Sequence, residues 1–157
     1  ALAVGEQHTC ALVDDGQVKC SGSNRKGQLA IPPNTTQRES FATAEIGRRR
    51  TFVAISAGSY HTCALTQGGL VRCWGDNSRG QCGTGDTNDV IEDREDVGEG
   101  LRPAVPESAS ALSCASDRCC AVLKNGQLLC WGAVNPEAQP IPKPDLVMEG
   151  VAQVSVG

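Results

Sequence analysis

The sequence predicts an all-β fold whose repeated hairpin units are stacked or arranged radially. A stretch that starts at His8, HTCALVDDGQVKC, returns at His61 as HTCALTQGGLVRC. A weaker third copy, RCCAVLKNGQLLC, starts at Arg118. Successive copies are separated by about 53 and about 57 residues, and periods of this length are typical of repeat architectures.

Composition fits such a fold and argues against two kinds of partner. The chain has 157 residues with 18 glycines and 8 prolines, which suits a structure with many turns. Its formal net charge of −4 gives no basis for binding a polyanion. Uninterrupted apolar runs reach about four residues, whereas a membrane-spanning helix needs about 20. We therefore expect one domain without a nucleic-acid partner and without direct membrane insertion.

Each copy is interpreted as two strands joined by a three-residue loop. Glycine occupies the third loop position every time, as in a type I turn closed by a glycine at positive φ. The loops are Asp14–Gly16, Gln67–Gly69 and Lys124–Gly126. This loop length fixes the register, because a two-residue loop would shift the pairing by one. With this register, the first cysteine of each copy lies opposite the second.

Six of the nine cysteines therefore form three cross-strand pairs. Opposed strand residues are close enough for a disulfide, and each bridge would stabilise the fold by about 2–3 kcal/mol. The pairs are Cys10–Cys20, Cys63–Cys73 and Cys120–Cys130. Such a density of cysteines favours an oxidising compartment, because cytosolic glutathione keeps thiols reduced.

Three cysteines remain outside these pairs. Cys114 and Cys119 stand where the second copy has alanine and threonine, and both flank the same tight turn. They predict a fourth bridge, Cys114–Cys119, with a bond between Cys119 and Cys130 as the alternative. Cys82 is then a free buried thiol or is bonded outside this segment.

Zinc is the competing interpretation of the cysteines. The sequence has no pair of C-x-x-C knuckles, and its only histidines are His8 and His61. Structural disulfides are therefore favoured, and we expect no metal and no cofactor. A catalytic role for the histidines would need an acid or nucleophile at fixed spacing in both copies, and none is present.

Beyond the second cysteine of the first two copies lie the runs SGSNRKGQLA and WGDNSRGQCGTGD. The pattern A-G-x-x-H-T-C-A-L, then G-x-V-x-C-W-G-x-N-x-x-G-Q-L-G, resembles the repeat of the regulator-of-chromosome-condensation family. The paired cysteines resemble its secreted and surface members. This resemblance covers nearly the whole chain. It implies a β-propeller of four-stranded antiparallel blades, usually seven in a ring, with each histidine packed and hydrogen-bonded through one ring nitrogen.

The repeated hairpins themselves also favour a propeller, because radial repetition protects the edges of the sheets. We expect repeats at about 1–53, 54–110 and 111–152, with 153–157 starting a fourth. Three blades cannot close a seven-bladed ring. We therefore expect the remaining blades to come from a longer chain or from neighbouring subunits.

Two copies depart from the pattern. The first has Ser21 where the others have Trp74 and Trp131, so another group must fill that space. The third has AVNPEAQP in place of the N-x-x-G-Q element, and Arg118 replaces its histidine. The third copy is therefore interpreted as a degenerate blade.

An acidic segment from Gly83 to Asp96 is a candidate contact with a partner. A calcium loop starting at Asp86 is excluded, since Val90 and Ile91 stand where an acid and a glycine are required. A solvated insertion is favoured, with docking onto a basic partner as the alternative. The candidate contact residues are Asp93, Glu95 and Asp96.

Two other surface features stand out. The basic run Arg48, Arg49, Arg50 is interpreted as a solvated turn, with a grip on a carboxylate or phosphate as the alternative. Asn34 opens an Asn-Thr-Thr acceptor for N-glycosylation and follows two prolines, which favours an exposed loop.

The leading hypothesis is a non-catalytic protein-interaction or scaffolding module. No nucleophile–base pair, phosphate loop or metal cluster stands out in the sequence. The cysteines place it outside the cytosol, either extracellular or at the cell surface, or as an accessory subunit in an oxidising organellar lumen. The resemblance also implies two alternatives: a guanine-nucleotide exchange factor for a small GTPase with chromatin binding, and a proteinaceous enzyme inhibitor. No residue identifies the partner.

Overall fold

The computed structural model describes residues 1–32, 34–44, 46, 50–90, 103–105, 108–134, 137 and 141–157. These residues form three four-stranded antiparallel sheets and no helix. The first sheet contains β1 (Leu2–Val4), β2 (His8–Leu12), β3 (Val18–Ser23) and β4 (Gln37–Thr43). The second contains β5 (Phe52–Ala57), β6 (His61–Thr66), β7 (Val71–Gly75) and β8 (Pro103–Val105). The third contains β9 (Ala109–Ala115), β10 (Arg118–Leu123), β11 (Leu128–Gly132) and β12 (Ile141–Met148).

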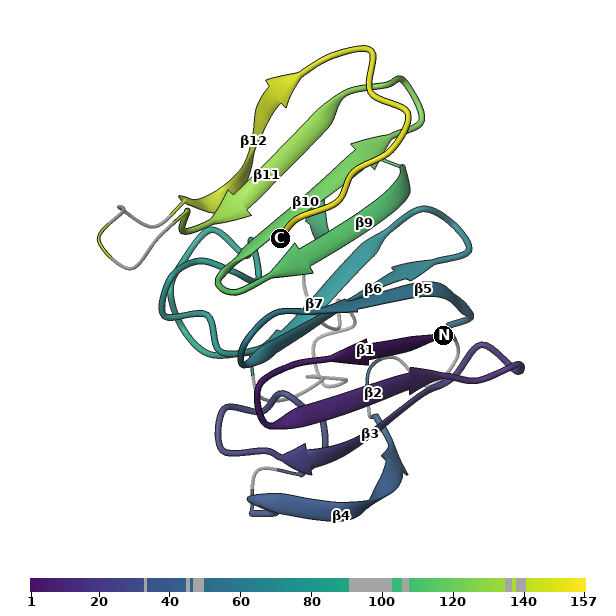
Figure 1. Ribbon diagram of the computed structural model, residues 1–157, viewed down its shortest axis with the longest axis vertical. Helices are drawn as coiled ribbons and strands as arrows, with labels where there is room; N and C mark the ends of the chain where they lie inside the picture. Colours follow the sequence, from purple (N-terminus) through teal and green to yellow (C-terminus); the bar gives the residue numbers. More distant parts are fainter. Residues whose placement is uncertain are drawn as a thin grey trace.

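The sheets are arranged as three adjacent blades of a partial β-propeller. Within each sheet the strands follow chain order, and the first strand of the second blade, β5, contacts both β1 and β9 (Figure 1). The predicted all-β propeller architecture is thereby confirmed. The second and third sheets begin at Phe52 and Ala109, slightly before the repeat boundaries expected at 54 and 111.

The hairpins have the register that the loop length predicts. Cys10 pairs with Cys20, and the same pairing recurs in the second and third blades. The glycine at the third loop position has a positive φ in each blade, 79° at Gly16, 86° at Gly69 and 84° at Gly126. A side chain at these positions would strain the turn.

Four disulfides join the opposed cysteines. They are Cys10–Cys20, Cys63–Cys73, Cys114–Cys119 and Cys120–Cys130. The tight turn of the third blade is therefore bridged by its own pair, and the alternative bond between Cys119 and Cys130 is absent from the structure. Cys82 is a free, buried thiol.

The hydrophobic core lies between the blades as well as within them. At the first seam, which is the boundary between blades one and two, Leu29 of the first blade packs in one cluster with Phe52 and Trp74 of the second. At the second seam, between blades two and three, Val71 shares a cluster with Trp131. Each blade therefore buries its apolar surface against its neighbour, as is usual for repeat proteins.

The C-terminal segment lies along the third blade. Val154 and Val156 pack against the apolar face formed by β10 and β11. The Val156 amide donates to the Ser113 hydroxyl at 3.0 Å, and the Cys114 amide donates to the Ser56 hydroxyl at 2.8 Å in the same way. Residues 154–156 thus lie against blade three as β9 lies against blade two (Figure 1).

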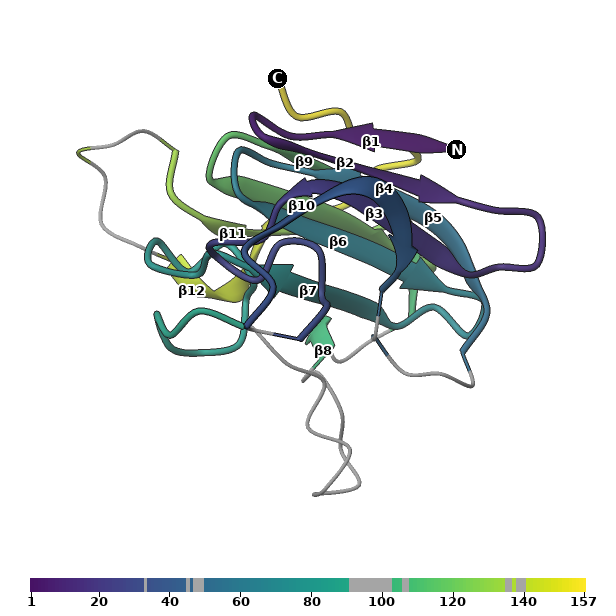
Figure 2. The ribbon, with the colours of Figure 1, turned by 90° about the horizontal axis from the view of Figure 1, so that it is seen from below.

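The two ends of the strands carry different connections. One end, here called the hairpin face, bears the three-residue loops between the second and third strands of each blade, together with the connections from β4 to β5 and from β8 to β9. The opposite end, here called the loop face, bears the tight turns before β2, β6 and β10 and the longer connections that follow β3 and β7 (Figure 2).

Substitution of Gly58, in the tight turn before β6, tests how closely this turn packs on its neighbours. A methyl group at Gly58 would overlap the His61 ring and the Ser116 carbonyl oxygen, so we expect Gly58→Ala to lower the free energy of unfolding by about 1–3 kcal/mol. Gly68→Ala is the control, because its nearest neighbour would be the Thr66 hydroxyl at 3.9 Å. Denaturant unfolding of both variants measures the difference, and equal losses would contradict the packing described here.

Candidate functional site

Both histidines lie buried at the seams and have structural partners. His8 Nε2 is 2.9 Å from the Thr62 hydroxyl of the next blade, which in turn donates to the Gln28 carbonyl at 3.2 Å. Burial lowers the pKa of His8 to about 4 and the pKa of His61 to about 3. Both rings are therefore neutral near pH 7 and join neighbouring blades.

The tryptophans close the same seams with a second hydrogen bond. Trp74 Nε1 donates to the Gln28 carbonyl at 2.9 Å, and Trp131 Nε1 donates to the Gln81 carbonyl at 2.9 Å. Both indole rings are fully buried. Each seam therefore contains an indole of one blade bonded to the backbone of the preceding blade.

The N-x-x-G-Q element explains why that carbonyl is available. In the first blade, Asn24 Oδ1 accepts from the Leu29 amide at 3.0 Å and its Nδ2 donates to the Thr35 carbonyl at 2.8 Å. Gln28 Oε1 accepts from the Lys26 amide at 2.8 Å. Equivalent amide-to-side-chain bonds hold the loop of the second blade. The buried amide side chains thus brace a loop whose backbone carbonyl points into the next blade.

Polar contacts also cross the first seam on the loop face. Lys26 Nζ lies 3.4 Å from Asp76 and 3.2 Å from Asp89, both of the second blade. Because the lysine side chain is partly exposed, these ion pairs contribute little stability. The Tyr60 hydroxyl donates to Glu6 at 2.6 Å, and this bond raises the pKa of Tyr60.

The tight turns form a chain of backbone hydrogen bonds along the loop face. The Glu6 amide donates to the Ser59 carbonyl at 3.0 Å, and the Ser59 amide donates to the Ser116 carbonyl at 2.9 Å. These three residues occupy equivalent places in the three copies. The tight turns of neighbouring blades are therefore joined by backbone hydrogen bonds, which do not depend on the identity of the side chains.

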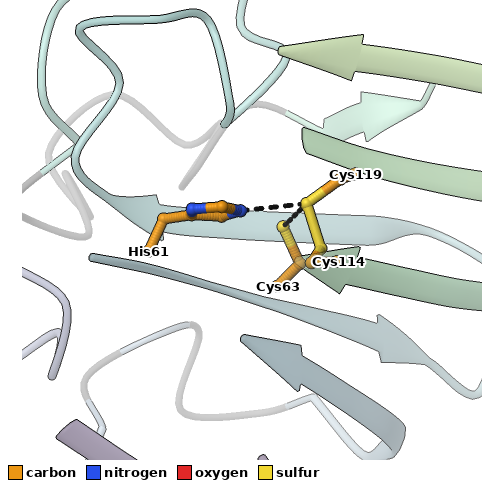
Figure 3. Close-up of side chains that lie close together, drawn as sticks. All are labelled: His61, Cys63, Cys114 and Cys119. Carbon is orange, nitrogen blue, oxygen red and sulfur yellow. Dashed lines mark hydrogen bonds between the residues drawn. A yellow bond between two sulfur atoms is a disulfide. The ribbon is translucent and has the colours of Figure 1, made fainter. Parts of the chain in front are cut away.

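The second seam differs from the first because cysteines replace small residues. His61 Nε2 lies 3.0 Å from Cys119 Sγ, and Cys63 Sγ lies 3.5 Å from the same sulfur (Figure 3). The disulfides Cys63–Cys73 and Cys114–Cys119 are therefore in contact. The nearest ligand atoms of His61, Cys63, Cys114 and Cys119 all lie within 4.8 Å of one another, and all four residues are buried.

Sequence reasoning did not group these four residues. His61 and Cys63 come from β6, whereas Cys114 and Cys119 come from β9 and β10 of the next blade. Their spacing in the chain matches no zinc motif. Only the packing of one blade on the next brings them together.

Cys82 is placed for packing and not for reactivity. Its amide donates to Asn77 Oδ1 at 2.8 Å, and its thiol lies 3.6 Å from the Asp76 carbonyl. Burial raises the pKa of the thiol well above its ordinary value, so it stays protonated at neutral pH. Leu29 occupies the equivalent position of the first blade, which fits an apolar role.

The surface candidates divide into described and undescribed residues. Asn34 and Arg50 are both exposed, and the Thr35 hydroxyl lies 3.4 Å from Asn34 Oδ1. Five other candidates lie outside the described residues and stay predictions: Arg48, Arg49, Asp93, Glu95 and Asp96. Among the described residues, no helix is long and apolar enough to span a membrane.

The repeated unit matches a known family. The model for the regulator of chromosome condensation (RCC1) repeat matches residues 1–28 and 52–81. Two of the three copies in the chain therefore match the RCC1 repeat. The matched segments contain the buried histidines and the N-x-x-G-Q loops of the first two blades, which are the parts that form the seams.

Known proteins share the repeat over a small part of their length. Human "Probable E3 ubiquitin-protein ligase HERC4" is 36% identical over 132 residues, which is 84% of this chain and 12% of the ligase. The human "X-linked retinitis pigmentosa GTPase regulator" is 37% identical over 92 residues, which is 56% of this chain and 9% of the regulator. The chain therefore spans a minor fraction of these relatives.

A solved structure shows the same fold. In the crystal structure of Kap60 bound to yeast RCC1 (Prp20), the matching chain superimposes with a TM-score of 0.78 at 18% identity. The match covers 96% of this chain and 37% of that chain. The three sheets thus correspond to a sector of an RCC1-type structure.

The two indole bonds predict unequal effects of the same substitution. The Gln28 carbonyl also accepts from Thr62, whereas Cys119 at the equivalent place has no hydroxyl, and the described residues provide no second donor to the Gln81 carbonyl. Trp131→Phe leaves that buried carbonyl without a partner. We expect it to lower the free energy of unfolding by about 1–3 kcal/mol more than Trp74→Phe does.

Denaturant unfolding of the two variants measures this difference. Both substitutions remove a similar volume of ring, so each serves as the control for the other. Equal losses, or a larger loss for Trp74→Phe, would contradict the asymmetry between the seams.

Proposed function

We propose that this chain is a sector of a non-catalytic β-propeller that holds another protein through its loop face, in an oxidising compartment. The compartment is the extracellular space, the cell surface or the lumen of an organelle. The difference between the two faces carries the proposal. The hairpin face offers three-residue turns and the connections from one blade to the next, whereas the loop face offers the longer connections within the first two blades. Such loops on a rigid scaffold are the usual place for binding.

The described part of the connection after β7 is held in place by hydrogen bonds before any partner arrives. Asn77 Nδ2 donates to the Thr84 hydroxyl at 2.9 Å and to the Asn88 carbonyl at 3.0 Å. The backbone N–H of Asn77 donates to Asp89 Oδ1 at 3.0 Å. A loop that is already ordered loses little conformational entropy on binding. Exposed charged residues on this face, such as Arg25 and Asp86, are available to a polar partner.

The comparisons support a protein as the partner. One relative is named as a GTPase regulator, and one structural neighbour was solved bound to the protein Kap60. The histidines are buried at the seams, which supports a non-catalytic role. The four disulfides support an oxidising compartment, because such bonds are rare in the cytosol and nucleus.

Site-specific photo-crosslinking tests the face. A photoreactive residue at position 25 samples the loop face, and one at position 67 samples the hairpin face. Both positions are exposed, so neither substitution disturbs the core. We expect partner cross-links from position 25 and none from position 67. Cross-links from position 67 alone, or from neither position, would refute the assignment.

Differential alkylation in the native source tests the compartment. We expect only Cys82 to react after unfolding without reduction, and the eight bridged cysteines to react after reduction. A chain in which all nine cysteines react without reduction would move the assignment to a reducing compartment. It would then favour the nuclear exchange-factor alternative.

A further inference from the structure

We propose that the four-residue cluster at the second seam, His61, Cys63, Cys114 and Cys119, is a redox-controlled zinc site. In the oxidised protein the three sulfurs belong to the disulfides Cys63–Cys73 and Cys114–Cys119. In the reduced protein the same sulfurs and the histidine nitrogen bind one Zn²⁺ ion.

The ligand set has the composition of a structural zinc site. Three thiolates and one imidazole are among the standard ligand sets for tetrahedral Zn²⁺. His61, Cys63 and Cys119 are fully buried, and Cys114 is almost so. A closed, dry site is what distinguishes structural zinc from catalytic zinc, which keeps a position open to water.

The distances are close to those the metal requires. In a tetrahedral site the ligand atoms lie about 3.5–3.8 Å apart, given Zn–S of ~2.3 Å and Zn–N of ~2.0 Å. Here Cys63 Sγ and Cys119 Sγ are 3.5 Å apart, and His61 Nε2 is 3.0 Å from Cys119 Sγ. All four atoms lie within 4.8 Å of one another. Breaking the Cys114–Cys119 bond lets those two sulfurs separate, which opens the centre of the cluster.

The chain builds this set at one seam only. At the first seam the equivalent residues are His8, Cys10, Ala57 and Thr62, which provide a single sulfur. The second seam gains its two extra sulfurs because Cys114 and Cys119 replace the alanine and the threonine. The orientation of His61 is already suitable, since its Nε2 faces the sulfurs (Figure 3).

The conversion from disulfides to the zinc site has two steps. The disulfides are first reduced to thiols, and Zn²⁺ then replaces thiol protons. Each disulfide takes two electrons and two protons from a dithiol, which becomes a disulfide itself. This step yields thiols at Cys63, Cys73, Cys114 and Cys119. Zn²⁺ then displaces one proton from each of the three thiols that it binds, while Cys73 keeps its proton. His61 binds through the lone pair of Nε2 and carries its hydrogen on Nδ1.

Cobalt spectroscopy tests the site directly. The protein is unfolded, reduced with a dithiol, freed of reductant and refolded without oxygen in the presence of Co²⁺. We expect one Co²⁺ per chain, with the thiolate charge-transfer and visible bands of tetrahedral cobalt, and its displacement by Zn²⁺. The oxidised protein should bind none. Failure of the reduced chain to refold with the metal or to bind it stoichiometrically would overturn the proposal.

Two variants make the result specific. Cys114→Ala combined with Cys119→Thr restores the residues of the first seam, so the variant keeps a histidine–hydroxyl pair and is expected to fold. It should lose the cobalt bands. Cys82→Leu is the matched control, because Leu29 occupies that position in the first blade, and it should keep them.

Full cobalt binding by the double variant, or loss of binding in Cys82→Leu, would place the metal elsewhere and overturn the proposal. The readout is independent of any protein partner. The outcome therefore does not depend on the photo-crosslinking that tests the loop face.

Discussion

The structure depends on a hydrogen bond between an indole and the backbone carbonyl of the preceding blade. Trp74 and Trp131 make this bond at 2.9 Å in fully buried seams. A buried carbonyl without a donor is costly, so the bond fixes how closely one sheet approaches the next. The same seams hold the shared apolar clusters and the histidines. Each blade is therefore cross-linked internally by disulfides, but its hydrophobic core is shared with the neighbouring blade.

Local features of the sequence were sufficient to predict the blades. A glycine such as Gly16 fixes the hairpin loop, the loop fixes the register, and the register brings Cys10 opposite Cys20. These relations involve residues close in the chain. The seams could not be predicted in the same way, because the bond from Trp131 to Gln81 and the contact of His61 with Cys119 join residues from different blades. The sequence around Trp131 or His61 does not indicate which residue of the other blade it contacts.

Departures from the repeat become intelligible at the seams. Ser21 replaces the tryptophan of the first blade, and the third copy lacks the N-x-x-G-Q element. The Val156–Ser113 hydrogen bond repeats the Cys114–Ser56 bond nevertheless. The contact between the first strand of one blade and the segment of the next copy therefore recurs along the chain. Changes at single seam positions also created the cysteine–histidine cluster without altering the blade itself.

Hydrogen exchange of the two indole protons measures the central interaction directly. The chain has two tryptophans, so its NMR spectrum contains two indole N–H signals. If both protons are bonded to carbonyls inside the seams, each will exchange with deuterium at least about 100-fold more slowly than in the unfolded chain. Exchange of either proton at the unfolded rate, in a chain that retains its strand content, would contradict this account.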